Sequence, residues 1–116
     1  MTILENPVAQ SVVEGDNLLL TCSGSGYPSI GITWFKDGSA ITSNVYRQAF
    51  SGISTLNIYS VSSSDGGSYM CLFSTSAGNL NSSVAEVVVL SKSIYCNYLY
   101  NLESNILSAL EFHAIL

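Results

Sequence analysis

The chain has 116 residues, enough for one domain with one hydrophobic core, and 47% of them are hydrophobic, which argues against wholesale disorder. Eight carboxylates outnumber Lys36, Arg47 and Lys92, and the net charge of -5 offers no basic surface to a phosphate backbone. We therefore expect no nucleic-acid partner.

From Pro7 to Leu90, short strand-like runs alternate with turn residues, which is typical of an all-β sandwich. Their apolar residues recur at every second position, as in strands that bury one face. The predicted strands, in chain order, are Val8–Val13, Asn17–Cys22, Ile32–Lys36, Val45–Ala49, Ser54–Tyr59, Ser68–Ser74 and Val84–Leu90.

The segments between these strands carry turn residues. Ser23–Gly31 has too many small residues for regular structure, and Asp37-Gly38 is a strong signal for a tight turn. Ser60–Gly67 forms a polar corner, and a hairpin is expected at Gly78 and Asn79.

Strand parity separates an inward set of residues from an outward one. The inward set is expected to form the core: Leu18, Leu20, Cys22, Ile32, Trp34, Leu56, Ile58, Tyr69, Cys71, Phe73, Ala85, Val87 and Val89. These residues all lie within residues 1–90, which we predict to be the folded domain.

Residues 91–116 have a different character, with Leu99, Leu102, Ile106 and Leu110 near helical spacing. One interpretation is a weakly helical or disordered tail. The other is read-through beyond an exon boundary in a gene prediction, since the predicted sandwich is complete at Leu90. Transcript sequence covering the segment would remove the second interpretation.

Two of the three cysteines are expected to form a disulfide. Cys22 and Cys71 lie 49 positions apart, on strands predicted to face each other across two sheets. Trp34 is placed to pack its indole on the bridge. Tyr69 is placed to send its hydroxyl back to the backbone of the polar corner.

These residues make the chain similar to the immunoglobulin superfamily, nearest its intermediate set. The resemblance covers about the first 90 residues and leaves the tail unexplained. The matching motifs are Val12-Val13-Glu14-Gly15, Leu20-Thr21-Cys22, Trp34-Phe35-Lys36-Asp37-Gly38, Leu56-Asn57-Ile58, Asp65-Gly66-Gly67-Ser68-Tyr69-Met70-Cys71, and Ala85, Val87 and Val89.

The resemblance implies a two-sheet antiparallel Greek-key sandwich. Asp65 and Gly67 complete the corner motif, where glycine suits a conformation that other residues enter at a cost. Arg47 is expected to pair with Asp65 beneath the corner, as the family often arranges.

The sequence offers little to catalysis. Its one histidine, His113, lies in the tail, so neither a Ser-His dyad nor a His-rich metal site is expected. We predict no enzyme activity, no metal, no cofactor and no small-molecule substrate.

Two further features concern modification. Asn81-Ser82-Ser83 is the one glycosylation sequon of the chain. Cys96 has no partner in the expected disulfide. It is a free thiol, forms an intermolecular bridge, or is an accident of the tail sequence.

Four apolar residues, Phe35, Met70, Leu72 and Val88, are predicted to point outward from neighbouring strands of one sheet. An exposed apolar patch of this kind often marks an interaction site, and family members commonly bind through this sheet. The alternative is that the aromatic residue after the tryptophan is a family habit and that the tail or a neighbouring domain covers the patch.

Three functions stay open. The first is an extracellular or cell-surface module for adhesion or ligand recognition, cut from a larger protein, with protein partners that include other immunoglobulin domains. The second is a structural module of a muscle or cytoskeletal protein, whose cysteines stay reduced. The third is an ectodomain fragment of a receptor kinase or phosphatase.

The sequence shows no signal-peptide pattern and no run of about 18 apolar residues, so we expect no membrane span in this chain.

Overall fold

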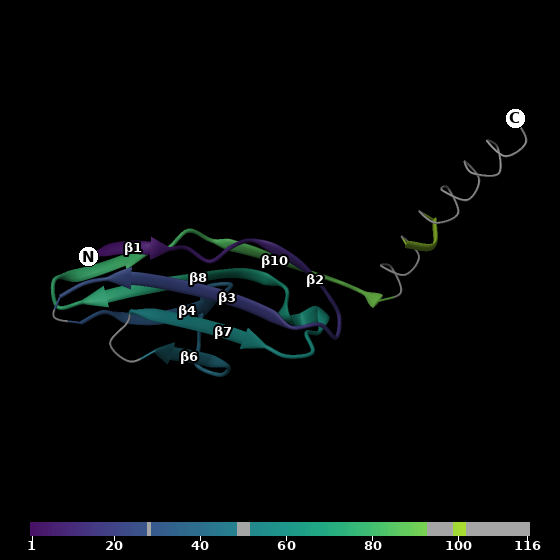
Figure 1. Cartoon of the computed structure of the whole chain (residues 1–116), viewed down its shortest axis with the longest axis horizontal. Coiled ribbons are helices and arrows are strands. Elements are labelled where there is room, and N and C mark those ends of the chain that lie inside the picture. The colour runs from purple at the N-terminus through teal and green to yellow at the C-terminus, as the bar shows by residue number, and fades with distance from the viewer. Residues whose placement is uncertain (28, 49–51, 93–98, 102–116) are drawn as a thin grey trace, which may run out of the picture.

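The computed structural model describes residues 1–27, 29–48, 52–92 and 99–101, without the side chains of residues 46–48. Its strands form two sheets packed face to face. In Figure 1, β3 and β7 of one sheet lie in front of β4 and β8 of the other. The predicted all-β two-sheet sandwich is confirmed.

The first sheet has the strand order β1-β3-β7-β6, and its neighbours are all antiparallel. Its strands are β1 (Thr2–Glu5), β3 (Leu18–Ser25), β6 (Val45–Gln48) and β7 (Ile53–Ile58). In the register of β3 and β7, Leu20 lies opposite Leu56 and Cys22 opposite Ser54.

The second sheet has the order β2-β10-β8-β4-β5, with β9 paired to β8. Its strands are β2 (Gln10–Val13), β4 (Gly31–Lys36), β5 (Ser39–Ile41), β8 (Gly67–Thr75), β9 (Gly78–Asn81) and β10 (Ala85–Leu90). A short 3-10 helix, η1 (Ser63–Asp65), joins the two sheets between β7 and β8. The pair of β2 and β10 is parallel, whereas the other pairs of this sheet are antiparallel, as expected.

The core lies between the sheets, where both contribute every second side chain. Most of the predicted inward residues are buried there, and Val12, Ile30 and Val61 add to them. Ile32, Ile58 and Val89 are only partly buried but pack against this core. Apolar area removed from water between the layers is the main term stabilising the fold.

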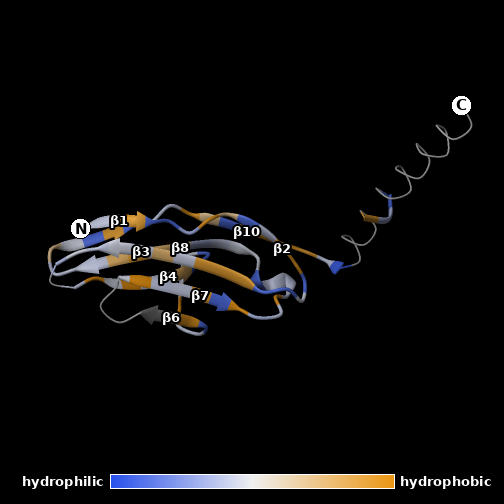
Figure 2. Ribbon diagram, viewed as in Figure 1, coloured by the Kyte–Doolittle hydropathy of each residue, from blue (hydrophilic) through white to orange (hydrophobic). Residues whose placement is uncertain are grey.

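The N-terminal part differs from the prediction in two places. The expected edge strand Val8–Val13 begins only at Gln10, and β1 precedes it without having been predicted. β3 continues to Ser25, into the segment expected to be irregular, because β1 pairs with it there. In Figure 2, β3 changes from hydrophobic (orange) to nearly neutral (pale) towards its Ser25 end. The hydrophobic pattern that predicts a buried strand is therefore weak in this part of β3.

The predicted tight turn and the predicted hairpin can both be located in the structure. Asp37 and Gly38 have φ values of 50° and 83°, the positive values of a type I′ hairpin turn between β4 and β5. The hairpin expected through Gly78 and Asn79 is present between β8 and β9, but both residues belong to β9 and not to its turn. The chain turns instead at Ser76 and Ala77, where the Thr75 hydroxyl accepts a hydrogen bond from the Ala77 backbone N–H at 3.2 Å.

The last strand ends at Leu90. Of the tail, only residues 91–92 and 99–101 are described, so Cys96, His113 and most of the predicted helical spacing lie outside the described residues. Within the part of the chain that the structure covers, no helix is both long and apolar enough to cross a membrane.

Candidate functional site

A disulfide joins the two sheets at their centre. Cys22 on β3 and Cys71 on β8 are bonded, with their Cα atoms 6.6 Å apart, and neither residue is accessible to solvent. The predicted bridge is therefore confirmed.

A buried hydrogen bond runs beside the disulfide. The Trp34 indole N–H donates to the Ser54 hydroxyl at 2.9 Å. Trp34 is the cross-strand partner of Cys71, and Ser54 is the cross-strand partner of Cys22. The two sheets are thus joined at adjacent positions by one covalent bond and one hydrogen bond. Ser54 was not predicted as a core residue, although its parity with the inward residues Leu56 and Ile58 indicates one.

The corner between β7 and β8 is closed by Tyr69. Its hydroxyl donates to the Asp65 carbonyl oxygen, and Asp65 Oδ2 accepts a hydrogen bond from the Ser62 N–H at 2.8 Å. Lys36 donates to the Ser64 carbonyl oxygen, and its ammonium lies 5.9 Å from the centroid of the Tyr69 ring. The Arg47 side chain lies outside the described residues, so its expected pairing with Asp65 stays a prediction.

The Tyr69 phenol should make stability fall at alkaline pH. Burial, and then the charges of Asp65 and Asp37, raise the pKa of Tyr69 to about 12. Below pH 10 the phenol is protonated in both the folded and the unfolded chain. Between pH 10 and 12 only the unfolded chain loses the proton, so the free energy of unfolding should fall by up to about 1.4 kcal/mol per pH unit.

Urea unfolding at pH 8 to 11.5 measures this slope. Tyr69→Phe should lose about 0.5–1.5 kcal/mol at pH 8, because the Asp65 carbonyl loses its donor, and its stability should then vary less with pH. Tyr59→Phe, at an exposed position, is the control and should follow the parent chain. Parallel curves for Tyr69→Phe and the parent would contradict the assignment.

Gly67 allows the corner to approach the β4–β5 turn closely. Its φ is +154°, and a Cβ placed there would lie 2.7 Å from the Asp37 carboxylate. That carboxylate accepts a hydrogen bond from the Ser68 N–H at 2.9 Å, so it has little freedom to move away.

Gly67→Ala should therefore lower the free energy of unfolding by about 1–3 kcal/mol, the usual cost of a strained backbone position. Thermal or urea unfolding measures the loss. Gly31→Ala is the matched control in the same sheet, because the nearest atom to its Cβ is 3.7 Å away. Equal stability of the two variants would rule out the close contact as the reason for glycine at 67.

Of the four residues predicted to form an exposed apolar patch, three lie together and Val88 lies apart. Phe35 and Met70 are direct cross-strand partners, and Leu72 follows two residues later on β8. These three residues, hereafter the sheet face, are half-buried. Val88 is 52% exposed, but Glu86 lies two residues before it on β10 and accepts a hydrogen bond from Ser68 at 2.6 Å. A carboxylate therefore lies between the sheet face and Val88.

The glycosylation sequon borders the sheet face. Asn81 is the direct partner of Leu72 across β8 and β9, and it is exposed. The following residue, Ser82, is buried and accepts a hydrogen bond from the Cys71 N–H at 2.8 Å.

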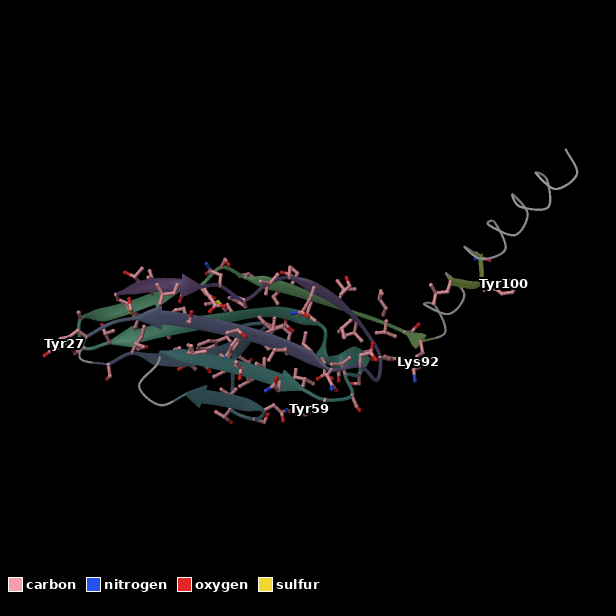
Figure 3. The ribbon with its side chains drawn as sticks, in the orientation of Figure 1. Tyr27, Tyr59, Lys92 and Tyr100 are labelled. Carbon is pink, nitrogen blue, oxygen red and sulfur yellow. A yellow bond between two sulfur atoms is a disulfide. The ribbon has the colours of Figure 1, made fainter. Side chains whose placement is uncertain are left out.

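Other surface features were not predicted. Tyr27 is 89% exposed and Tyr59 is 64% exposed. Figure 3 shows Tyr27 at one end of the sandwich, with Tyr59 and Lys92 towards the other. The exposure of Tyr27 could have been predicted from its place in a Ser/Gly-rich connection between strands.

Two findings bear on chemistry. A cavity of about 110 Å³ beside Leu56, Ile58 and Asp65 is well below the roughly 300 Å³ at which small-molecule sites begin. Among the described residues, no group of three or more His, Cys, Asp or Glu is placed to hold a metal ion.

Comparison with known sequences shows which family the chain resembles. A family model described as an immunoglobulin domain matches residues 2–74. Hemicentin-1 of Homo sapiens is 42% identical over 77 residues, which is 64% of this chain and 1% of that protein. The netrin receptor DCC of Rattus norvegicus is 31% identical over 99 residues, which is 85% of this chain and 7% of that protein. The chain thus spans only a small part of these relatives.

Solved structures agree on the architecture. The titin fragment I67-I69 matches with a TM-score of 0.69 and 27% identity, over 77% of this chain and 32% of the fragment. The complex of titin M10 with an obscurin-like 1 Ig domain also matches with a TM-score of 0.69, at 26% identity, over 77% of this chain and 92% of the matched one.

Proposed function

Because this chain belongs to the immunoglobulin domain family, we propose that it is an extracellular recognition module, which binds proteins in adhesion or ligand recognition as part of a larger protein. The observation that carries this proposal is the buried disulfide between Cys22 and Cys71, since such bonds form and persist in oxidising compartments. The similarity to hemicentin-1 and to the netrin receptor DCC supports it.

The sheet face is the proposed contact surface. Phe35, Met70 and Leu72 carry no charge, whereas the chain as a whole carries -5. The net charges of two copies repel each other, and a face without carboxylates adds no like-charge contact to that repulsion. We therefore assign the face to another immunoglobulin domain, in the first instance a second copy of this chain. The titin M10 complex is a related structure in which such a domain has a partner.

Self-association of unglycosylated protein tests the proposal. Sedimentation equilibrium should show a concentration-dependent dimer, and Leu72→Asp should weaken it by about tenfold or more, or at least 1.4 kcal/mol. Leu19→Asp is the matched control, because Leu19 is 54% exposed on the other sheet. The thermal midpoint of each monomer shows whether the variant is folded.

A parent chain that stays monomeric at every concentration would rule out the homophilic contact. Equal dimerisation of Leu72→Asp and the parent would instead move the contact away from the sheet face.

A structural module of a muscle protein is the second candidate, and the titin fragments favour it. Such a module would be intracellular, with Cys22 and Cys71 reduced. The redox state of the pair in protein from its native source separates the two candidates.

A further inference from the structure

We propose that an N-linked glycan on Asn81 lies across the sheet face and keeps protein partners away from Phe35, Met70 and Leu72. The inference rests on the proposed function, because a chain meets the glycosylation machinery only on the secretory route. Glycosylation would then regulate protein binding: partners can reach the sheet face in the unglycosylated form, and the glycan covers this face in the glycosylated form.

The sequon is open to modification. Asn81-Ser82-Ser83 is the one Asn-x-Ser/Thr sequence in the chain, and both Asn81 and Ser83 are exposed. The side chain between them is turned inward, as the burial of Ser82 shows. The two residues that the modification needs are thus on the surface.

Strand register aims the glycan at the sheet face. Cys71 and Phe73 are fully buried, so Leu72 between them points to the outer side of the sheet. Asn81 is directly opposite Leu72 in the antiparallel pair of β8 and β9. Directly opposed side chains stand on the same side of a sheet, so the Asn81 amide leaves β9 beside Leu72.

The residues of the sheet face are close enough to Asn81 for a glycan on Asn81 to cover them. The Cβ atoms of directly opposed residues lie about 5 Å apart, and diagonal neighbours such as Asn81 and Met70 lie about 7–8 Å apart. Phe35 is one strand further, a step of about 4.8 Å. An oligosaccharide of several sugar rings is longer than either separation, and the apolar faces of its rings suit contact with an aromatic side chain.

The attachment point is held in place. Ser82 donates its backbone N–H to the Cys71 carbonyl at 2.8 Å, and its hydroxyl accepts from the Cys71 N–H at 2.8 Å. The residue next to Asn81 is thereby fixed to the backbone of the disulfide cysteine. The backbone that carries Asn81 is therefore held beside Leu72.

The oxidation rates of the two methionines measure how far the glycan covers the sheet face, and the measurement needs no binding partner. Protein secreted from glycosylating eukaryotic cells is compared with its Asn81→Gln variant during treatment with dilute hydrogen peroxide, which converts exposed methionine to the sulfoxide. Intact mass should show a glycan on the parent chain only. Peptide mass should show Met70 oxidising several-fold more slowly in the glycosylated chain, while Met1, 45% exposed, oxidises equally in both.

A relocated glycan is the matched control. Adding Tyr59→Thr to the Asn81→Gln chain creates a new sequon that starts at Asn57, and Asn57 lies opposite Leu19 on the other sheet. Met70 in this doubly substituted chain should oxidise as fast as in Asn81→Gln alone.

Two results would overturn the inference: no glycan on Asn81 of the secreted chain, or a Met70 rate that the Asn81 glycan leaves unchanged. Neither bears on whether unglycosylated copies dimerise. Failure of the masking and failure of the proposed contact are therefore distinguishable.

Discussion

Replacing both Cys22 and Cys71 by alanine is expected to lower the free energy of unfolding by about 4 kcal/mol. The bond closes a loop of 49 residues, and the chain-entropy relation gives that value for a loop of this length. Domains of this size are stable by only about 5–15 kcal/mol, so the change removes much of the total. Both sulfurs are inaccessible to solvent, so their packing is lost as well.

Urea unfolding followed by circular dichroism measures this effect. A Cys96→Ser background keeps the third thiol from exchanging with the pair. Reduction of the Cys96→Ser chain under unfolding conditions should produce most of this loss, because it removes the cross-link but keeps the two sulfur atoms. A midpoint that neither treatment moves would show that the bridge does not constrain the unfolded chain.

The sequence predicted the central strands well because their two-residue period is strong. The prediction Ile32–Lys36 corresponds to β4 (Gly31–Lys36), and Ser54–Tyr59 corresponds to β7 (Ile53–Ile58), with the ends displaced by one residue. In both strands a large side chain, Trp34 or Leu56, is buried at 1% exposure or less, and the hydrophobic effect fixes which face it takes.

The edges could not be predicted in the same way because tertiary pairing decides them. Gly24 has weak strand propensity, but it lies in β3 because β1 pairs with it and because its missing Cβ leaves room for the Phe73 ring, 3.0 Å from where that Cβ would stand. The pairing of Asn81 with Leu72 depends on the turn at Ser76 and Ala77, whose position the sequence misplaced. The position of the glycosylation sequon beside the sheet face therefore became visible only in the structure.

Trp34→Ala is expected to cost about 3–5 kcal/mol, the usual range for truncating a large aromatic residue in a core. Trp34 is 0% exposed and lies between the sheets beside the disulfide, so the surrounding strands have little freedom to fill the space. Since Trp34 is the one tryptophan of the chain, unfolding must be followed by circular dichroism.

A double-mutant cycle separates the hydrogen bond from the packing. Trp34→Phe keeps an aromatic ring but removes the N–H that donates to Ser54, and Ser54→Ala removes the acceptor. Each single change should cost at least about 1 kcal/mol, and the double variant should be more stable than their sum predicts by about 1 kcal/mol, because the bond is lost only once. Thr33→Ala, at an exposed position of the same strand, is the control and should change stability by less than about 0.5 kcal/mol. Strict additivity of the two core substitutions would mean that the indole acts through its volume alone.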